Sequence, residues 1–131
     1  MKRWAFLLPL FLGACAHHGN LAKAPAAFDG QMAKDTAKAM RVVWPPQQTT
    51  LKTETTHPDP FLNVLIETLR ADGYAVAPVG SKTGSELHYV VDRLDAYHYR
   101  VSVQLDGHSI HRLYQAAQGR LTPAGAWSRQ D

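Results

Sequence analysis

Two runs of alternating apolar and polar residues meet at Asp106-Gly107, and this junction constrains the fold more than any other feature of the chain. An Asp-Gly pair between such runs is typical of a two-residue type I′ turn, which joins two antiparallel strands and fixes their register. The strands are expected over residues 97–105 and 108–116. One face of this hairpin then carries the apolar side chains of Tyr99, Val101, Val103, Leu105, Ile110 and Tyr114.

A third strand is expected directly before the hairpin, over residues 86–94. An odd-length loop around residues 95–97 is needed to put its apolar side chains on the apolar face of the hairpin. The same register places Asp92 opposite Arg100 on the other face, and opposite charges in that position stabilise a sheet. The side chains that join the apolar face are those of Leu87, Tyr89 and Val91.

Two amphipathic helices are predicted from apolar residues at spacings of three and four. The main packed helix covers residues 60–72, with Asp59 as its N-cap and Gly73 as its stop. The N-terminal helix covers residues 29–43 and has a thinner apolar stripe, with Asp35 on its solvent side.

The remaining elements are short. Residues 49–55 are β-branched and alternating, which predicts an edge strand, and residues 74–79 predict one more strand. Arg93 and Arg112 fall on the apolar face and are expected at its rim, with their charged ends in water. The predicted fold is α+β, a small two-layer domain with a mostly antiparallel four- to five-stranded sheet and the two helices.

The amino-terminal residues indicate a signal peptide. Lys2 and Arg3 precede an apolar run of about nine residues, which is well short of the roughly 20 residues that a membrane-spanning helix needs. The run ends at Leu12-Gly13-Ala14 directly before Cys15, the only cysteine of the chain. This tetrapeptide resembles the bacterial lipobox, in which the cysteine sulfur receives a diacylglycerol; the alternative is a chance cysteine beside an ordinary cleavage site.

The lipobox interpretation divides the chain into three parts. Residues 1–14 are the signal peptide, with Leu12, Gly13 and Ala14 recognised by the peptidase, and residues 15–27 are a lipidated tether. Residues 28–131 form a single periplasmic domain. Because Ala16, not Asp, follows the cysteine, resemblance to sorted lipoproteins implies a lipid anchor at the periplasmic face of the outer membrane.

Charge and motifs exclude several functions. Processing removes Lys2 and Arg3 from the 14 Lys and Arg residues, which leaves them nearly balanced by 11 Asp and Glu residues, so direct nucleic-acid contact is not expected. Residues 80–83 lack the order of a phosphate-binding loop. The seven histidines show no metal-ligand spacing, and the one cysteine is consumed by lipid. We therefore expect no catalytic residues, no metal, no cofactor and no enzyme.

The face of the sheet opposite the apolar one is the candidate site. A tethered domain without catalytic chemistry needs a surface that binds a protein partner, although an ordinary solvent-exposed sheet face has the same composition. The candidate side chains are those of His88, Val90, Leu94, His98, Arg100, His111 and Leu113.

Several short stretches run in order through the chain: Leu12-Gly13-Ala14-Cys15, Trp44-Pro45-Pro46, Asp59-Pro60-Phe61, residues 69–76, Tyr89-Val90-Val91-Asp92, Tyr99-Arg100-Val101, Arg112-Leu113-Tyr114 and residues 123–127. Through this ordered set the chain resembles the TrbH family of conjugal transfer lipoproteins. Two features depart from the family: Trp44 stands where another aromatic such as Tyr is expected, and residues 80–85 lack a Pro/Ala-rich insertion.

The resemblance implies an outer-membrane lipoprotein that acts as a structural or assembly component of the type IV secretion-like apparatus for conjugal DNA transfer. Its partners would be other mating-pair and channel proteins in a hetero-oligomeric complex. The alternative is a periplasmic carrier that holds a small hydrophobic ligand between helix and sheet, in a cavity lined by Leu65, Leu69, Tyr89 and Val101.

Overall fold

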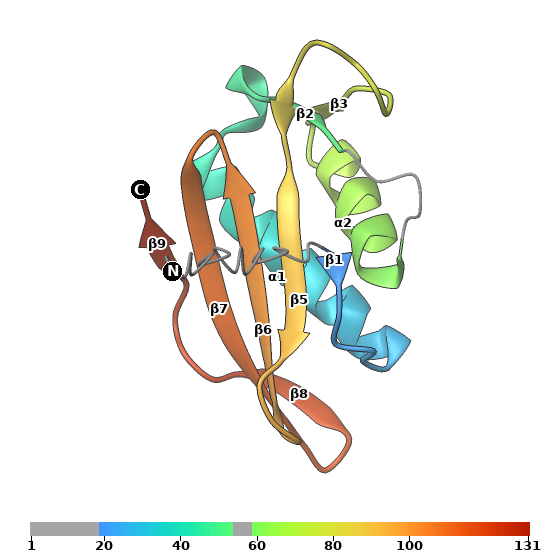
Figure 1. Cartoon of the computed structure of the whole chain (residues 1–131), viewed down its shortest axis with the longest axis vertical. Helices are drawn as coiled ribbons and strands as arrows, with labels where there is room; N and C mark the ends of the chain where they lie inside the picture. The colour runs from blue at the N-terminus through green and yellow to red at the C-terminus, as the bar shows by residue number, and fades with distance from the viewer. Residues whose placement is uncertain (1–18, 54–58) are drawn as a thin grey trace, which may run out of the picture.

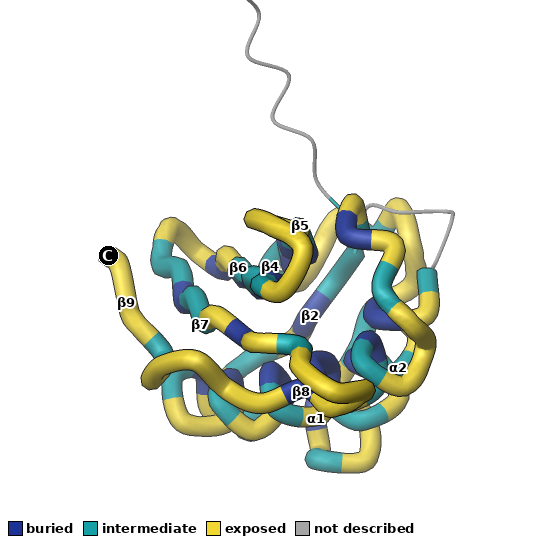
Figure 2. Tube along the Cα trace, turned by 90° about the horizontal axis from the view of Figure 1, so that it is seen from below, coloured by how far each residue is buried: buried dark blue, intermediate teal, exposed yellow. Residues whose placement is uncertain are grey.

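The α+β fold has its helices on one side of its main sheet (Figures 1 and 2). The computed structural model describes residues 19–53 and 59–131. Within these residues, the main sheet has six strands in the order β1-β5-β6-β7-β8, with β9 also paired to β7, and a small sheet has the order β3-β2-β4. The strands are β1 (Gly19–Asn20), β2 (Thr50–Lys52), β3 (Ala75–Val76), β4 (Ser85–Glu86), β5 (His88–Arg93), β6 (His98–Leu105), β7 (His108–Ala117), β8 (Arg120–Pro123) and β9 (Ser128–Gln130).

The three-stranded meander at the centre of the sheet confirms the predicted register. Tyr99 on β6 lies opposite Tyr114 on β7, and the turn between these strands has positive φ at both Asp106 (51°) and Gly107 (79°), as a type I′ turn requires. On the preceding pair of strands, Asp92 lies opposite Arg100. In agreement with the predicted alternation, every apolar side chain predicted for this face is buried.

The main packed helix is α2 (Pro60–Ala71), which ends one residue earlier than predicted. The Asp59 side chain caps it by accepting a hydrogen bond from the Leu62 backbone N–H at 3.0 Å. Gly73 follows with a φ of 97°, a conformation that suits glycine at a helix end. Its buried side chains, Phe61, Leu62, Leu65 and Leu69, pack into the core between the helices and the sheet.

The N-terminal helix corrects the predicted tether. It is α1 (Ala26–Val43), three residues longer at its start than expected. Upstream of it, β1 pairs in parallel with β5, and Ala22 is buried with 4% of its surface exposed. Residues 19–27 therefore belong to the fold and not to a tether, because backbone pairing with the distant strand β5 and buried contacts hold a segment that shows no apolar periodicity. The proposed signal peptide and Cys15 lie outside the described residues.

The sheet also differs from the prediction in its edges. The main sheet is mixed, since β1 is parallel to β5, and it has more strands than the four or five expected. The strand predicted over residues 49–55 is β2, and it is central in the small sheet because β3 and β4 pair with it in parallel on either side. A 3₁₀ turn over Pro46–Gln48 separates β2 from α1.

Candidate functional site

The face of the meander that points away from the helices is called the open face here and consists of the side chains in three cross-strand rows. These rows are His88-Gln104-Ser109, Val90-Ser102-His111 and Asp92-Arg100-Leu113, together with Leu94, His98 and Gln115 at one end. The seven predicted surface residues thus lie on one continuous surface, as alternation along the strands requires. Leu94 and Leu113 are 47% and 40% exposed.

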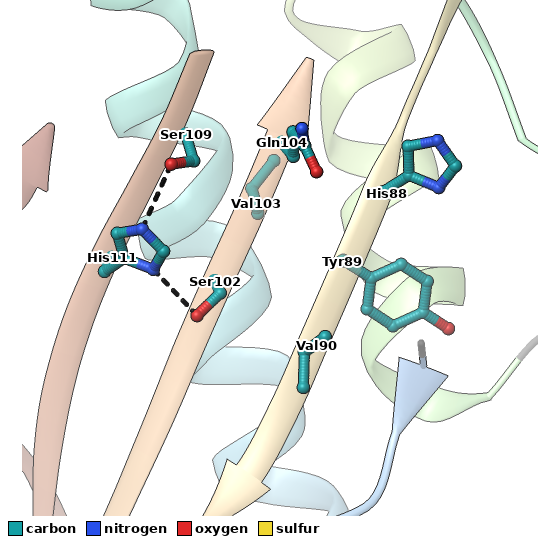
Figure 3. Close-up of a pocket in the computed structure, with 8 residues that line it drawn as sticks. All are labelled: His88, Tyr89, Val90, Ser102, Val103, Gln104, Ser109 and His111. Atoms are coloured by element: carbon teal, nitrogen blue, oxygen red, sulfur yellow. Dashed lines mark hydrogen bonds between the residues drawn. The ribbon is translucent and has the colours of Figure 1, made fainter. Parts of the chain in front are cut away.

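A shallow hollow of about 200 Å³ lies at one end of the open face, between β5 and β7 (Figure 3). His111 stands between two serines: its Nδ1 lies 2.9 Å from Ser102 Oγ and its Nε2 lies 3.1 Å from Ser109 Oγ. His88 faces the hollow from β5 and lies 3.3 Å from a Glu86 carboxylate oxygen. Since both nitrogens of His111 contact hydroxyls, neither is left for the carboxylate that orients the histidine of a Ser-His-Asp triad.

An ion pair crosses the middle of the open face. Arg100 donates from Nε to Asp92 Oδ1 at 3.1 Å and from Nη2 to Asp92 Oδ2 at 2.5 Å. This bidentate contact raises the pKa of Arg100 above its ordinary value. The pair is half-exposed and neutral as a unit, so it supplies hydrogen-bonding groups to a partner without adding net charge.

His98 lies at the other end of the face and is held by the loop between β5 and β6. Its Nδ1 lies 2.8 Å from Asp95 Oδ2. The pKa of Asp95 is lowered, first by the hydrogen bond from the Tyr97 backbone and then by His98. His88 lies opposite Gln104, six residues along β6 from His98, so the two histidines are well separated along the open face.

The C-terminal segment contributes a neighbouring hollow that the sequence did not predict. This hollow, of about 290 Å³, is lined by Arg100, His111, Arg112, Leu113, Gly125, Ala126 and Ser128. It forms because β8 and β9 both pair with β7, and the residues between them arch past its edge. The open face is therefore bordered on one side by the last residues of the chain.

Arg112 holds this segment in place and corrects two predictions. Its Nη1 lies 2.8 Å from Asp35 Oδ2, and its Nε donates to the Gly125 carbonyl at 2.9 Å. Its guanidinium also lies 5.8 Å from the centre of the Trp127 ring. The charged end of Arg112 is thus paired and not in open water, and Asp35 faces the sheet and not solvent. Arg93, by contrast, is exposed, as the rim position predicted.

Leu21 is a surface residue that the sequence reasoning missed. Its backbone N–H donates to the Val91 carbonyl at 2.7 Å, which continues the pairing of β1 with β5 beyond Asn20. By alternation, Leu21 therefore lies beside Asp92 at the margin of the open face, and it is 50% exposed. The sequence does not predict this position of Leu21, because residues 15–27 are expected to form a tether.

Other predicted features concern ligands and membranes. In residues 19–53 and 59–131, no three His, Cys, Asp or Glu side chains are grouped so that they could hold a metal ion. Within the same ranges, no helix combines the length and apolar character needed to span a bilayer. The residues proposed for lipid attachment and peptidase recognition, Cys15 with Leu12, Gly13 and Ala14, lie outside these ranges.

The residues named for a ligand-carrying cavity are part of the buried core. Leu65, Leu69 and Val101 have no exposed surface, and Tyr89 is 7% exposed. Tyr89 stacks on Phe61 of α2, with ring centres 5.5 Å apart. These side chains pack against one another and fill the interface between helix and sheet.

Comparison with known proteins supports the resemblance found in the sequence. A protein-family model described as conjugal transfer protein TrbH matches residues 16–131. Neither a curated protein nor a solved structure matches the chain. The family match spans the meander, both helices and the C-terminal segment that borders the open face. The chain therefore belongs to the TrbH family of conjugal transfer proteins.

Proposed function

We propose that this protein is a lipid-anchored structural component of the conjugal DNA-transfer apparatus, attached through Cys15 to the periplasmic face of the outer membrane. The family membership supports a place in conjugal transfer. The lipobox-like Leu12-Gly13-Ala14-Cys15 supports the anchor, and the family match begins at the residue after Cys15. The role proposed is one of scaffolding, with no catalytic step.

The observation that carries this proposal is that the helices cover only one of the two faces of the main sheet. Both helices cover the same face (Figure 2), and the open face presents partly exposed apolar side chains among polar groups that are already paired. The Asp92–Arg100 pair and the His111–serine contacts already satisfy part of the hydrogen-bonding capacity of these groups, so a partner that covers them leaves fewer polar atoms without a hydrogen bond. We propose that other mating-pair or channel proteins bind the open face.

Replacement of the anchor residue tests the location. In Cys15→Ser, the protein should no longer fractionate with the outer membrane, and conjugal transfer should fall. Ala16→Asp is the matched variant, since it keeps the sulfur while changing the residue that directs sorting. Transfer that falls in both variants would show that the outer membrane itself is needed; full transfer and unchanged fractionation in Cys15→Ser would contradict the proposal.

Site-specific crosslinking tests the open face. A photoreactive phenylalanine derivative at position 113 should capture another protein of the transfer apparatus in mating cells. The same group at position 42 is the control, because Val42 is 82% exposed but lies on α1, away from the open face. Equal capture from both positions, or capture from position 42 alone, would contradict the assignment of the open face as the binding surface.

The carrier alternative has no comparable support. In the described part of the chain, the side chains that would line its cavity belong to the buried core. A bound ligand would have to displace Tyr89 from its stacking contact with Phe61.

A further inference from the structure

Three exposed apolar side chains gather at the end of the sheet where β5 turns into β6. They are Leu21, Leu94 and Tyr97, which are 50%, 47% and 64% exposed, and they are called the apolar tip here. Leu21 continues the β1 pairing beside Asp92. Leu94 follows Asp92 by two residues, directly after the end of β5, and its N–H donates to the His98 carbonyl at 2.9 Å, so both side chains lie on the open-face side of the sheet. Tyr97 is in the loop that joins the two strands.

Two cationic side chains, Lys23 and Arg93, lie close to the apolar tip, and the exposed Asp95 lies in the same loop as Tyr97. Lys23 is exposed two residues after Leu21, and Arg93 is exposed directly before Leu94. Arg93 donates to the carbonyls of Asp95 and Ala96 in the loop, at 3.2 and 3.0 Å. Apolar side chains rimmed by Lys and Arg suit the boundary between lipid headgroups and acyl chains, and a tyrosine is favoured at that depth.

The position of the anchor limits what can cover the apolar tip. Only residues 16–18 separate Cys15 from β1, and four residue steps span at most about 14 Å. Gly19 pairs with Val90, and Leu94 lies four residues later in the chain, directly after the end of β5, or about 13 Å away at the usual rise of a strand. Because these lengths are similar, residues 16–18 are long enough for the apolar tip to reach the surface of the bilayer that holds an acylated Cys15.

We propose that the apolar tip inserts into the interface of the membrane to which Cys15 is anchored and thereby fixes the orientation of the fold. This inference rests on the lipid anchor of the proposed function. Leu21, Leu94 and Tyr97 face the bilayer, so Leu94 is not part of the surface available to a protein partner, and the remaining rows of the open face, with the hollow around His111, stay accessible. The two membrane contacts have different roles: the acyl chains retain the protein at the membrane, and the apolar tip orients it.

The single cysteine of the chain permits a direct test. The full-length lipidated protein carrying Tyr97→Cys is purified, labelled with an environment-sensitive fluorophore and reconstituted into phosphatidylethanolamine–phosphatidylglycerol vesicles. Spin-labelled phospholipid in the same vesicles should quench the fluorophore at position 97 severalfold more strongly than one introduced by Val42→Cys. Adding Leu21→Ser and Leu94→Ser to Tyr97→Cys should remove most of this difference. These are surface positions, so the fold should tolerate the changes.

The label count separates the two possible failures. One label per chain, together with an intact mass that includes Cys15 and its acyl groups, shows that Cys15 is acylated, and equal weak quenching at positions 97 and 42 then overturns the inference while leaving the anchor in place. Two labels per chain show a free Cys15 thiol and overturn the proposed function and the inference together. Shielding at position 97 that grows with the protein-to-lipid ratio and is insensitive to the spin-labelled lipid would assign the apolar tip to a second copy of this chain, which also overturns the inference.

Discussion

The first and the last segments that the structure describes are each fastened to the rest of the fold by a polar cluster, and the two clusters share one kind of contact and differ in charge. In the C-terminal cluster, the Tyr114 hydroxyl on β7 donates to Asp35 on α1. In the N-terminal cluster, the Tyr89 hydroxyl on β5 donates to Asp59, the N-cap of α2. Burial raises the pKa of both tyrosines, and the hydrogen bond to aspartate raises it further, so both hydroxyls keep the proton that they donate.

The difference lies in the third member of each cluster. Arg112 pairs with Asp35 and supplies a positive charge, whereas Asn20 donates its neutral amide to Asp29 at 3.0 Å and to Asp59 at 3.5 Å. Asp29 is only 2% exposed, and its pKa is raised by burial and by the charge of Asp59, against the effect of the Asn20 hydrogen bond. The C-terminal cluster is therefore balanced in charge, and the N-terminal cluster concentrates negative charge.

The largest effect is expected from removing the balancing charge. Arg112→Ala should lower the free energy of unfolding by about 2 kcal/mol, because it leaves Asp35 half-buried without its cation and removes the bond to Gly125. Arg129→Ala is the matched control in the same segment, and its exposed pair with Asp131 should contribute little to stability. Urea unfolding followed by circular dichroism measures both, and equal losses would show that the balance of charge is unimportant.

A smaller loss is expected at the N-terminal cluster. Asn20→Ala removes the amide that bonds Asp29 and the side-chain oxygen that accepts from the Ala22 backbone, so the free energy of unfolding should fall by about 1.5 kcal/mol. Asn63→Ala is the control, since Asn63 is exposed on α2 and should change stability little. If Asn20→Ala behaves like this control, β1 does not depend on the cluster for its place in the sheet.

The parts of the fold that could be predicted are those fixed by neighbouring residues. The Asp106-Gly107 turn sets the register of β6 and β7 through its own backbone geometry. Alternation then assigns each side chain to a face, and the open-face residues follow from it. The Asp59 cap and Gly73 mark α2 in the same local way.

The parts that could not be predicted depend on contacts between distant residues. Asn20 is placed by Asp29 and Asp59, nine and 39 positions away, and the two-residue strand β1 carries no alternation of its own. Arg112 meets Asp35 across 77 positions. Leu21 and the C-terminal border of the open face were missed for this reason, since no local pattern encodes either contact.

The shared tyrosine–aspartate contact gives a finer test of the comparison. Tyr89→Phe should cost about 1 kcal/mol, because the neutral Asn20 amide does not replace the lost donor to Asp59. Tyr114→Phe should cost less, since Arg112 still neutralises Asp35. Each substitution removes one hydroxyl and keeps the ring, so unfolding in urea compares the two directly. A larger loss for Tyr114→Phe would reverse the proposed difference between the clusters.

The smallest effect is expected in how the free energy of unfolding depends on pH, and Asp29 and Asp131 contribute to it with opposite signs. The folded protein binds the Asp29 proton more tightly than the unfolded chain does, because its pKa is raised above 3.8. This contribution is complete below that value and is lost as the pH rises through the raised pKa, so stability falls with increasing pH there. The pKa of the exposed Asp131 is lowered by His108 and then Arg129, so its contribution is lost as the pH falls. Urea unfolding from pH 3 to 7 should show that the free energy of unfolding decreases with rising pH above about pH 4. This decrease should be absent in Asp29→Asn and retained in Asp131→Asn. A decrease that persists in Asp29→Asn would have to come from groups outside the N-terminal cluster.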